Sequence, residues 1–228
     1  MSDYQRARTP EHKQERMDAI MAAADWLFAR LPYHAITMGT IAEELGWSRT
    51  NLYKYAATKE EIFLALHEAK DRAWLEDLVG ALKAAKGAEA GGAGSVEDAT
   101  APLPVESFAR IWAETTDRHV DFLRYQEILI AIIESNVTLE RLAAFKRGWA
   151  DMVAPICDVL AAQCGISADE ALNLYLRLLF QAPALLAHFR CTDLTREAMA
   201  LAGLPPVTGT FVDSYADFVA VCLRAARS

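Results

Sequence analysis

Residues 37–61, TMGTIAEELGWSRTNLYKYAATKEE, decide the fold that we expect for this chain. Their apolar spacing predicts two short helices around a tight turn and the start of a third helix. Thr37 and Ser48 stand where N-cap side chains accept hydrogen bonds from free backbone N–H groups. Gly46 stands at the turn, where we expect a positive φ. The arrangement predicts a helix-turn-helix, which places the first residues of its second helix in a DNA major groove.

The second short helix carries the side chains that such a role needs. Residues 47–59 contain no Asp or Glu. Arginine reads guanine and asparagine reads adenine through paired hydrogen bonds in the major groove. We therefore expect base contacts from the start of this helix, by Arg49, Thr50, Asn51 and Lys54.

Residues 10–66 resemble the DNA-binding domain of the TetR family of transcriptional regulators. In that family a long first helix precedes a pattern that this chain matches at many positions. The matching residues are Thr37, Ile41, Ala42, Gly46, Trp47, Ser48, Leu52, Tyr53, Tyr55, Thr58, Lys59, Glu60 and Ile62. The resemblance implies that a smaller set holds DNA phosphates, namely Thr37, Ser48, Tyr53, Tyr55 and Lys59.

The chain departs from the family pattern at two positions. Thr50 stands where a glycine is usual, which changes how closely this backbone approaches DNA. Ala56 stands where a phenylalanine is usual and removes a core aromatic side chain. We expect Trp47 or Phe63 to fill the space.

The acidity of the chain lies mostly outside the expected DNA-binding region. The 228 residues carry a net charge of −8. Residues 1–70 hold nine Lys and Arg against ten Asp and Glu, a net of −1, so the remainder carries −7. A local cationic face can bind phosphate while an acidic body repels non-specific DNA.

Composition also limits the other classes of function. The cysteines at positions 157, 164, 191 and 222 lack the spacing of metal ligands and are expected to be reduced core thiols. We expect no metal and no cofactor. The N-terminus has no apolar signal core, and the uncharged run Leu178–Phe189 is too short to span a bilayer. We therefore expect a cytoplasmic protein with no membrane partner.

The rest of the chain has helical periodicity, so we expect an all-α protein of two domains. Residues 1–66 would form the helix-turn-helix domain and residues 67–228 a larger effector-binding and dimerisation domain. The first helix starts at Pro10 and a fourth runs over residues 59–83. Residues 87–104, rich in Gly, Ala and Pro, are expected to form a surface loop. The remaining helices are expected at residues 105–119, 120–135, 139–164, 168–190, 193–202 and 210–226.

The resemblance implies that a small molecule binds inside the second domain. Apolar and aromatic side chains with a few polar groups are typical of such sites. The candidates are Trp112, His119, Phe122, Tyr125, Leu129, Trp149, Met152, Tyr175, Gln181 and His188. The alternative for each is an ordinary place in the core or on the surface. An apolar or aromatic effector is expected.

Two apolar stripes on the last long helices predict a homodimer. They recur at helical spacing and consist of Leu172, Leu176, Leu179 and Pro183, and of Phe211, Tyr215, Phe218 and Cys222. In the family, two such helices per subunit form a four-helix bundle across a two-fold axis. The alternative is that both stripes face the core of their own chain.

The sequence thus predicts a ligand-responsive regulator, a repressor that binds a palindromic operator in double-stranded DNA as a homodimer. A ligand-independent DNA-binding factor of the same fold remains an alternative. A helical enzyme is a weaker one, because no catalytic Ser/His/Asp spacing, Glu-x-x-His pair or glycine-rich phosphate loop occurs.

Overall fold

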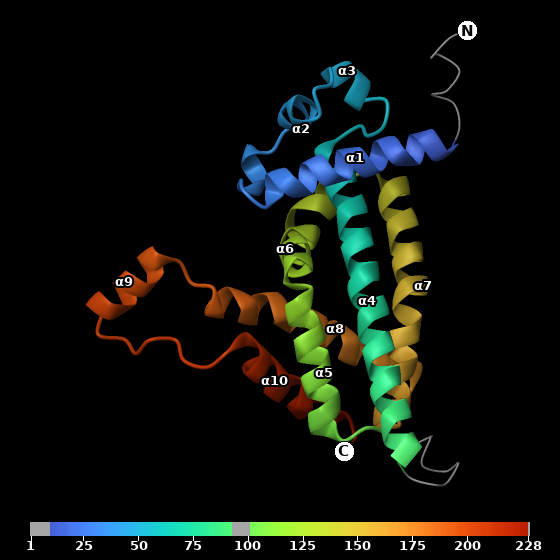
Figure 1. Cartoon of the computed structure of the whole chain (residues 1–228), viewed down its shortest axis with the longest axis vertical. Helices are drawn as coiled ribbons and strands as arrows, with labels where there is room; N and C mark the ends of the chain where they lie inside the picture. Colours follow the sequence, from blue (N-terminus) through green and yellow to red (C-terminus); the bar gives the residue numbers. More distant parts are fainter. Residues whose placement is uncertain (1–9, 93–100, 228) are drawn as a thin grey trace. The chain divides into compact units, whose positions relative to one another are not determined.

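The computed structural model describes residues 10–92 and 101–227, and over these residues it contains helices and no β-strand (Figure 1). The all-α prediction is confirmed. The chain divides into two compact units, one of residues up to Lys70 with Tyr125–Arg147, the other of Asp71–Arg124 with residues from Gly148 onward. Helices α4, α6 and α7 each begin in one unit and end in the other.

The first unit holds the predicted helix-turn-helix. Its elements are α1 (Pro10–Phe28), the 3-10 turn η2 (Tyr33–Ala35), α2 (Met38–Glu44), α3 (Arg49–Leu52) and the start of α4 (Lys59–Gly92). It also holds the end of α6 (Val120–Ile128), the π-helical turn η4 (Leu129–Ile133), the 3-10 turn η5 (Glu134–Asn136) and the start of α7 (Leu139–Cys164).

An aromatic cluster fills the core of this unit. The ring of Phe63 lies edge-on to Phe28 at 5.2 Å and to Tyr33 at 4.9 Å between centroids. Tyr125 packs on Phe28 at 4.9 Å and donates a hydrogen bond of 2.6 Å to Asp25 of α1. Edge-to-face pairs add to the free energy of burial, so the cluster fixes α1 against the start of α4.

The second unit is a bundle of longer helices. It holds the remainders of α4, α6 and α7, together with α5 (Val105–Arg118), α8 (Ala168–Phe189), α9 (Asp193–Leu201) and α10 (Phe211–Ala226). Helix α10 packs against α5 and α8, and Trp74, Trp112 and Tyr215 are among its fully buried side chains. This unit has one large apolar core.

Two element boundaries differ from the sequence-based expectation. Helix α4 continues to Gly92, past the expected start of a loop at residue 87, because alanine-rich sequence sustains a helix across Gly87. The rest of the expected loop, residues 93–100, lies outside the described residues. Residues 120–135 are not one α-helix, because a π-helical and a 3-10 turn follow Ile128.

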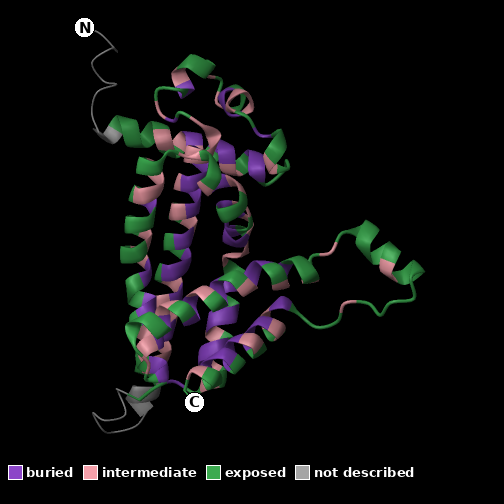
Figure 2. Ribbon diagram, turned by 180° about the vertical axis from the view of Figure 1, so that it is seen from behind, coloured by how far each residue is buried: buried purple, intermediate pink, exposed green. Residues whose placement is uncertain are grey.

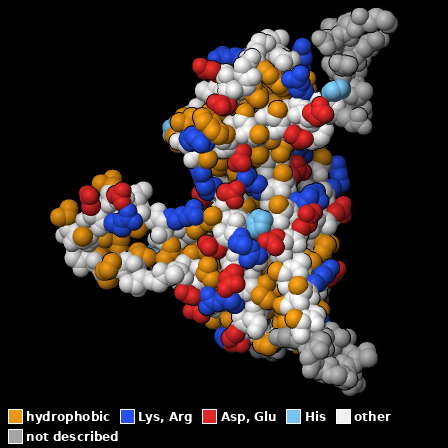
Figure 3. All heavy atoms as spheres, in the orientation of Figure 1, with side chains coloured by type: hydrophobic (Ala, Val, Ile, Leu, Met, Phe, Trp, Pro, Cys, Tyr) orange, Lys and Arg blue, Asp and Glu red, His pale blue; other side chains and the backbone are white. Residues whose placement is uncertain are grey.

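Helix α9 and its flanking segments project from the second unit and are almost entirely exposed (Figure 2). Apolar side chains gather on this arm (Figure 3). Leu194 and Leu201 have 76% and 91% of their surface exposed.

No single described helix is long and apolar enough to cross a membrane. By length and composition alone, α7 and α8 pass such a test only as a pair, and that pair is bent by 105°.

Candidate nucleic-acid interface

A reciprocal cap begins helix α2. The Thr37 hydroxyl oxygen accepts a hydrogen bond of 3.1 Å from the Thr40 backbone N–H, and the Thr37 backbone N–H donates one of 2.9 Å to Thr40 Oγ1. These bonds satisfy donors that a helix N-terminus otherwise leaves free. The N-cap predicted at Thr37 is confirmed, and its side chain remains exposed.

The turn after α2 depends on a left-handed glycine. Gly46 has a φ of 65°, as the sequence predicts. The backbone N–H of Trp47 donates to the Ala42 carbonyl at 2.8 Å, which closes the end of α2. Ile41 and Leu52 lie beneath the turn with no exposed surface. The angle between α2 and α3 is therefore fixed by backbone bonds and by a small core.

Helix α3 is shorter than expected. Ser48 caps it by accepting a hydrogen bond of 3.2 Å from the Asn51 N–H, but the helix ends at Leu52. Lys54 and Tyr55 lie in the following turn, where their backbone N–H groups bond to carbonyls three residues back. The final turn is tightened to a 3-10 pattern, as is common at helix ends.

Most of the expected DNA-contacting side chains are accessible. Arg49, Thr50 and Lys54 are exposed, Tyr53 is 54% exposed, and Asn51 is half-buried. We call these five residues the α3 face. Since they offer cationic, amide and hydroxyl groups together, the α3 face has the chemistry to contact both phosphates and base edges.

The guanidinium of Arg49 lies directly over Gly39 of α2. A Cβ atom at Gly39 would come within 2.5 Å of Arg49 Nη2 and 2.9 Å of Arg49 Cζ. The absence of a side chain at Gly39 therefore permits the position of Arg49. No role for Gly39 was expected from the sequence.

Tyr55 is packed rather than free. The centroid of the half-buried Trp47 ring lies 5.9 Å from the centroid of the Tyr55 ring. The Arg16 guanidinium carbon lies 5.0 Å from the centroid of the Trp47 ring. Ala56 is buried, and Phe63 occupies the adjoining aromatic cluster. Trp47 and Phe63, the two aromatic side chains expected to fill the space left at Ala56, therefore both pack within this unit.

Lys59 has partners within the chain. Its ammonium donates to the backbone carbonyls of Tyr33 and Ile36 at 3.0 and 2.7 Å and lies 4.0 Å over the Tyr33 ring. Burial lowers its pKa, although the charge of Glu60 opposes this. Two of the three ammonium donors are therefore engaged in joining η2 to α4.

Five of the ten expected effector-contacting side chains belong to the core of the second unit. Phe122 stacks on Trp74 at 5.2 Å, and Trp149 lies 6.2 Å from Tyr175. Trp112 donates its indole N–H to the Tyr215 hydroxyl oxygen at 3.1 Å. The five are Trp112, Phe122, Trp149, Met152 and Tyr175.

The other five lie elsewhere. Tyr125 and Leu129 belong to the first unit, where the Tyr125 hydroxyl donates to Asp25. His188 is exposed and Gln181 is half-buried on α8.

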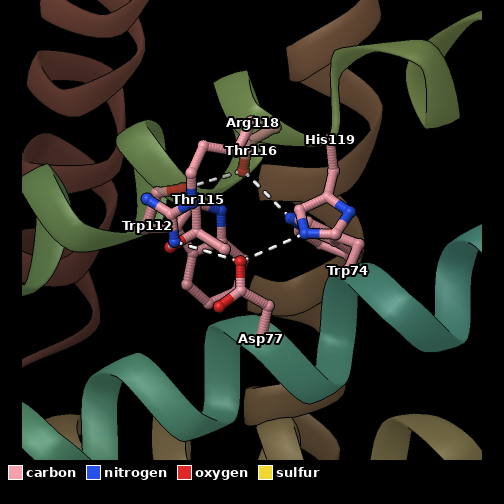
Figure 4. A network of polar contacts seen from close by, with 7 residues as sticks. All are labelled: Trp74, Asp77, Trp112, Thr115, Thr116, Arg118 and His119. Atoms are coloured by element: carbon pink, nitrogen blue, oxygen red, sulfur yellow. Dashed lines mark hydrogen bonds and ion pairs between the residues drawn. The ribbon is translucent and has the colours of Figure 1, made fainter.

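His119 belongs to a polar network at the end of α5 (Figure 4). Its ring nitrogen Nε2 lies 3.1 Å from Asp77 Oδ2, which also accepts a hydrogen bond from Arg118 at 3.0 Å. Burial opposes ionisation of Asp77, but the bonds from Arg118 and His119 prevail and hold its pKa below the usual value. This network ties α5 to α4.

Hollows lie on the second unit near the expected effector region. One of about 470 Å³ is lined by Arg72, Leu75 and Met152, and one of about 330 Å³ by Leu103 and Phe108. Asp71, whose side chain is fully buried in this unit, was not among the residues expected from the sequence. Helical spacing could have found it, because Asp71 shares a face of α4 with Trp74, Leu75 and Leu78.

The apolar stripes on α8 and α10 mostly face their own chain. Tyr215 has no exposed surface and donates a hydrogen bond of 2.9 Å to the Leu178 carbonyl of α8. Four further members are buried and three are partly buried. The buried ones are Leu179, Pro183, Phe211 and Cys222, and the partly buried ones are Leu172, Leu176 and Phe218. The buried members make their contacts within their own chain and leave little of their own surface exposed.

Different apolar side chains face outward on the same two helices. Phe180 of α8 is 48% exposed and Val221 of α10 is 59% exposed. Asn173, Arg177 and Ala184 continue the exposed stripe of α8 at helical spacing.

Two family models match the chain. Residues 20–66 match the model described as bacterial regulatory proteins of the tetR family, and residues 68–227 match the one described as the tetracyclin repressor-like C-terminal domain. The chain is also 38% identical over 60 residues to an uncharacterized HTH-type transcriptional regulator, YfiR, of Bacillus subtilis (strain 168). That match covers 26% of this chain and 29% of the length of the curated relative.

Solved structures share the fold. A transcriptional regulator of the TetR/AcrR family from Thermobifida fusca YX-ER1 aligns with a TM-score of 0.50 at 16% identity, covering 92% of this chain and 96% of the other. A TetR family regulator from Marinobacter aquaeolei VT8 aligns with a TM-score of 0.50 at 14% identity, covering 94% and 98%.

Proposed function

The chain belongs to the TetR family of bacterial transcriptional regulators, and we propose that it is a homodimeric repressor that a small molecule releases from a palindromic operator. The observation that carries the proposal is the capped pair of helices α2 and α3, which presents the α3 face free of acidic residues. Residues 1–66 supply DNA binding and residues 67–228 supply effector binding and dimerisation.

Roles within the DNA-binding domain follow from chemistry and exposure. Arg49, Thr50 and Asn51 read base edges, because they lie on the first turn of the exposed helix. Tyr53 and the exposed hydroxyls of Thr37 and Ser48 hold phosphates, which set the position on DNA without reading sequence. We assign Lys54, expected among the base contacts, to a phosphate as well, because it lies in the turn after α3 and not on its first turn.

We propose a further role for two residues of the expected phosphate set, Lys59 and Tyr55. We assign Lys59 chiefly to positioning, because its ammonium holds two backbone carbonyls. Tyr55 keeps a phosphate contact through its hydroxyl while its ring packs on Trp47.

Dimerisation uses the outward faces of α8 and α10, where Phe180 and Val221 are accessible. In a two-fold interface each residue is buried in both subunits, so every apolar contact counts twice. The two α3 faces of the dimer would enter successive major grooves about 34–36 Å apart.

Release of DNA would be a population shift. An effector that prefers a dimer with another spacing of α3 favours the state that does not fit the operator. Helices α4, α6 and α7 each continue from one compact unit into the other. A displacement of these helices around the effector would therefore be transmitted along the helices to the DNA-binding unit. The protein would act in the cytoplasm, where operator DNA is found.

Selection of bound duplexes from a random DNA pool tests the proposal. The expected result is a palindrome whose half-sites are one or two helical turns apart. Failure to enrich any sequence, or enrichment of a single half-site without symmetry, would contradict it.

A further inference from the structure

A carboxyl group is buried within the apolar face of α4. Asp71 has no exposed surface, and neither of its oxygens accepts a hydrogen bond from any described residue. Its neighbour Arg72 is exposed and makes no hydrogen bond to it. Burying a polar group without a partner is unfavourable, and burying an unpaired charge is more so.

A second unpartnered polar group lies near Asp71. The Tyr175 hydroxyl of α8 is buried and has no hydrogen-bond partner among the described residues. Trp74, one turn from Asp71 on the same face of α4, has its ring centroid 6.3 Å from that of Tyr175, so the three side chains lie in one region of the core. Burial raises the pKa of Tyr175, and the charge of Asp71 raises it further. Asp71 and Tyr175 do not bond to each other, although a tyrosine hydroxyl readily donates to a carboxylate.

Other interior polar groups of the same unit are paired. The Trp74 indole N–H donates to Thr116 at 3.2 Å, and Tyr215 accepts from Trp112 and donates to a backbone carbonyl. Gln163 both accepts from and donates to the Leu103 backbone. Asp71 and Tyr175 are therefore exceptions in a well-satisfied core, and such exceptions call for a ligand or a function.

We infer that the effector is a protonated amine on an aromatic or apolar body, and that its N–H groups donate to the Asp71 carboxylate and the Tyr175 hydroxyl oxygen. This inference rests on the proposed function, because it names the chemical class of the effector. Aromatic rings suit such a cation. Trp74 and Trp149 lie 6.3 and 6.2 Å from the Tyr175 ring, measured between centroids.

A hollow on the second unit lies beside the turns of α4 that follow Asp71. The hollow of about 470 Å³ is lined by Arg72, Leu75 and Glu76, which belong to the same two turns of α4, and by Met152 of α7. Its volume is within the range of about 300–1,000 Å³ that small-molecule sites occupy. Met152 has a flexible side chain that adapts readily to a ligand.

The test uses three compounds with one ring system and different charges, namely pyrenemethylamine, pyrenemethanol and pyrenecarboxylate. Each is titrated into the full-length protein at mildly alkaline pH, with tryptophan and pyrene fluorescence as readouts. The amine should bind about tenfold or more tightly than the alcohol, as expected for a charge-assisted hydrogen bond, and the carboxylate should bind weakest. Asp71→Asn should remove the preference for the amine, and Tyr175→Phe should weaken it.

Asp77→Asn is the matched control, because Asp77 also lies on α4 but is part-exposed and paired with Arg118. It should leave the preference unchanged. Equal binding of amine and alcohol, stronger binding of the carboxylate, no binding of the three, or a preference that survives in Asp71→Asn would each overturn the inference. None of these results would affect selection of a palindrome, which tests the proposed function separately.

Discussion

Replacing Asp71 by asparagine should stabilise the fold at alkaline pH and leave it unchanged at acid pH. Burial raises the pKa of Asp71 from 3.8 to about 7, although the charge of Arg72 opposes this. Between these values the folded chain holds a proton that the unfolded chain has released, so stability falls as pH rises. Over about three pH units, at about 1.4 kcal/mol each, the wild type loses about 4 kcal/mol. Asparagine has no such proton, so the variant avoids this loss.

His67 produces the opposite dependence and must be separated from that of Asp71. Burial lowers its pKa from 6.5 to about 4, with a further lowering by Lys146 and an opposing hydrogen bond to Gln126. The unfolded chain then binds the extra proton, so this contribution to stability rises with pH by about 3 kcal/mol. The two effects nearly cancel in the wild type. The informative quantity is therefore the difference between Asp71→Asn and wild type at each pH.

Urea unfolding followed by tryptophan fluorescence and circular dichroism gives this difference at about pH 4, 5.5 and 8, at one protein concentration. The difference should grow from near zero to about 4 kcal/mol. Asp77→Asn is the control and should destabilise the protein as pH rises, because hydrogen bonds lower the pKa of Asp77. A difference that does not change with pH, or an Asp71→Asn protein less stable than wild type at alkaline pH, would refute the reasoning.

Three further outcomes are expected. Phe180→Glu should weaken the dimer by at least about 100-fold in sedimentation, because two apolar contacts are lost and two charges are buried, whereas Leu139→Glu, in the other compact unit, should not. Gly39→Ala should displace the Arg49 guanidinium and alter base preference in a binding selection while leaving the melting temperature nearly unchanged, since only the end of a flexible side chain must move. Lys54→Ala should lower the salt dependence of operator binding by about one unit per subunit, whereas Lys59→Ala should chiefly lower the melting temperature. A Lys59→Ala protein of normal stability with a reduced salt slope would reverse these two assignments.

Local rules of backbone chemistry were sufficient to predict the DNA-binding part of the fold. Thr37 and Ser48 are caps and Gly46 has a positive φ because these features depend on a few neighbouring residues. The TetR family pattern also depends on local positions, because it covers the same stretch of the chain.

Tertiary partners could not be read from periodicity alone. A stripe such as Phe211, Tyr215 and Cys222 shows that a helix has an apolar face, but not whether that face meets its own chain or a second copy. Lys59 has the charge of a phosphate ligand, yet backbone carbonyls distant in sequence hold its ammonium. The hydrogen bond between Tyr125 and Asp25 could not be read from periodicity for the same reason, because the two residues lie 100 positions apart.

The most direct test of the central claim is to repeat the random-pool selection with Asn51→Ala and compare it with wild type. Asn51 lies on α3, the helix that carries the proposed base contacts. We predict that wild type enriches a palindrome and that Asn51→Ala loses base preference at the same position of both half-sites. Each lost contact should cost about 1–3 kcal/mol of binding free energy, and the preference at the other positions should be retained. An Asn51→Ala protein that enriches the wild-type palindrome unchanged, or a wild type that enriches no palindrome, would contradict the account.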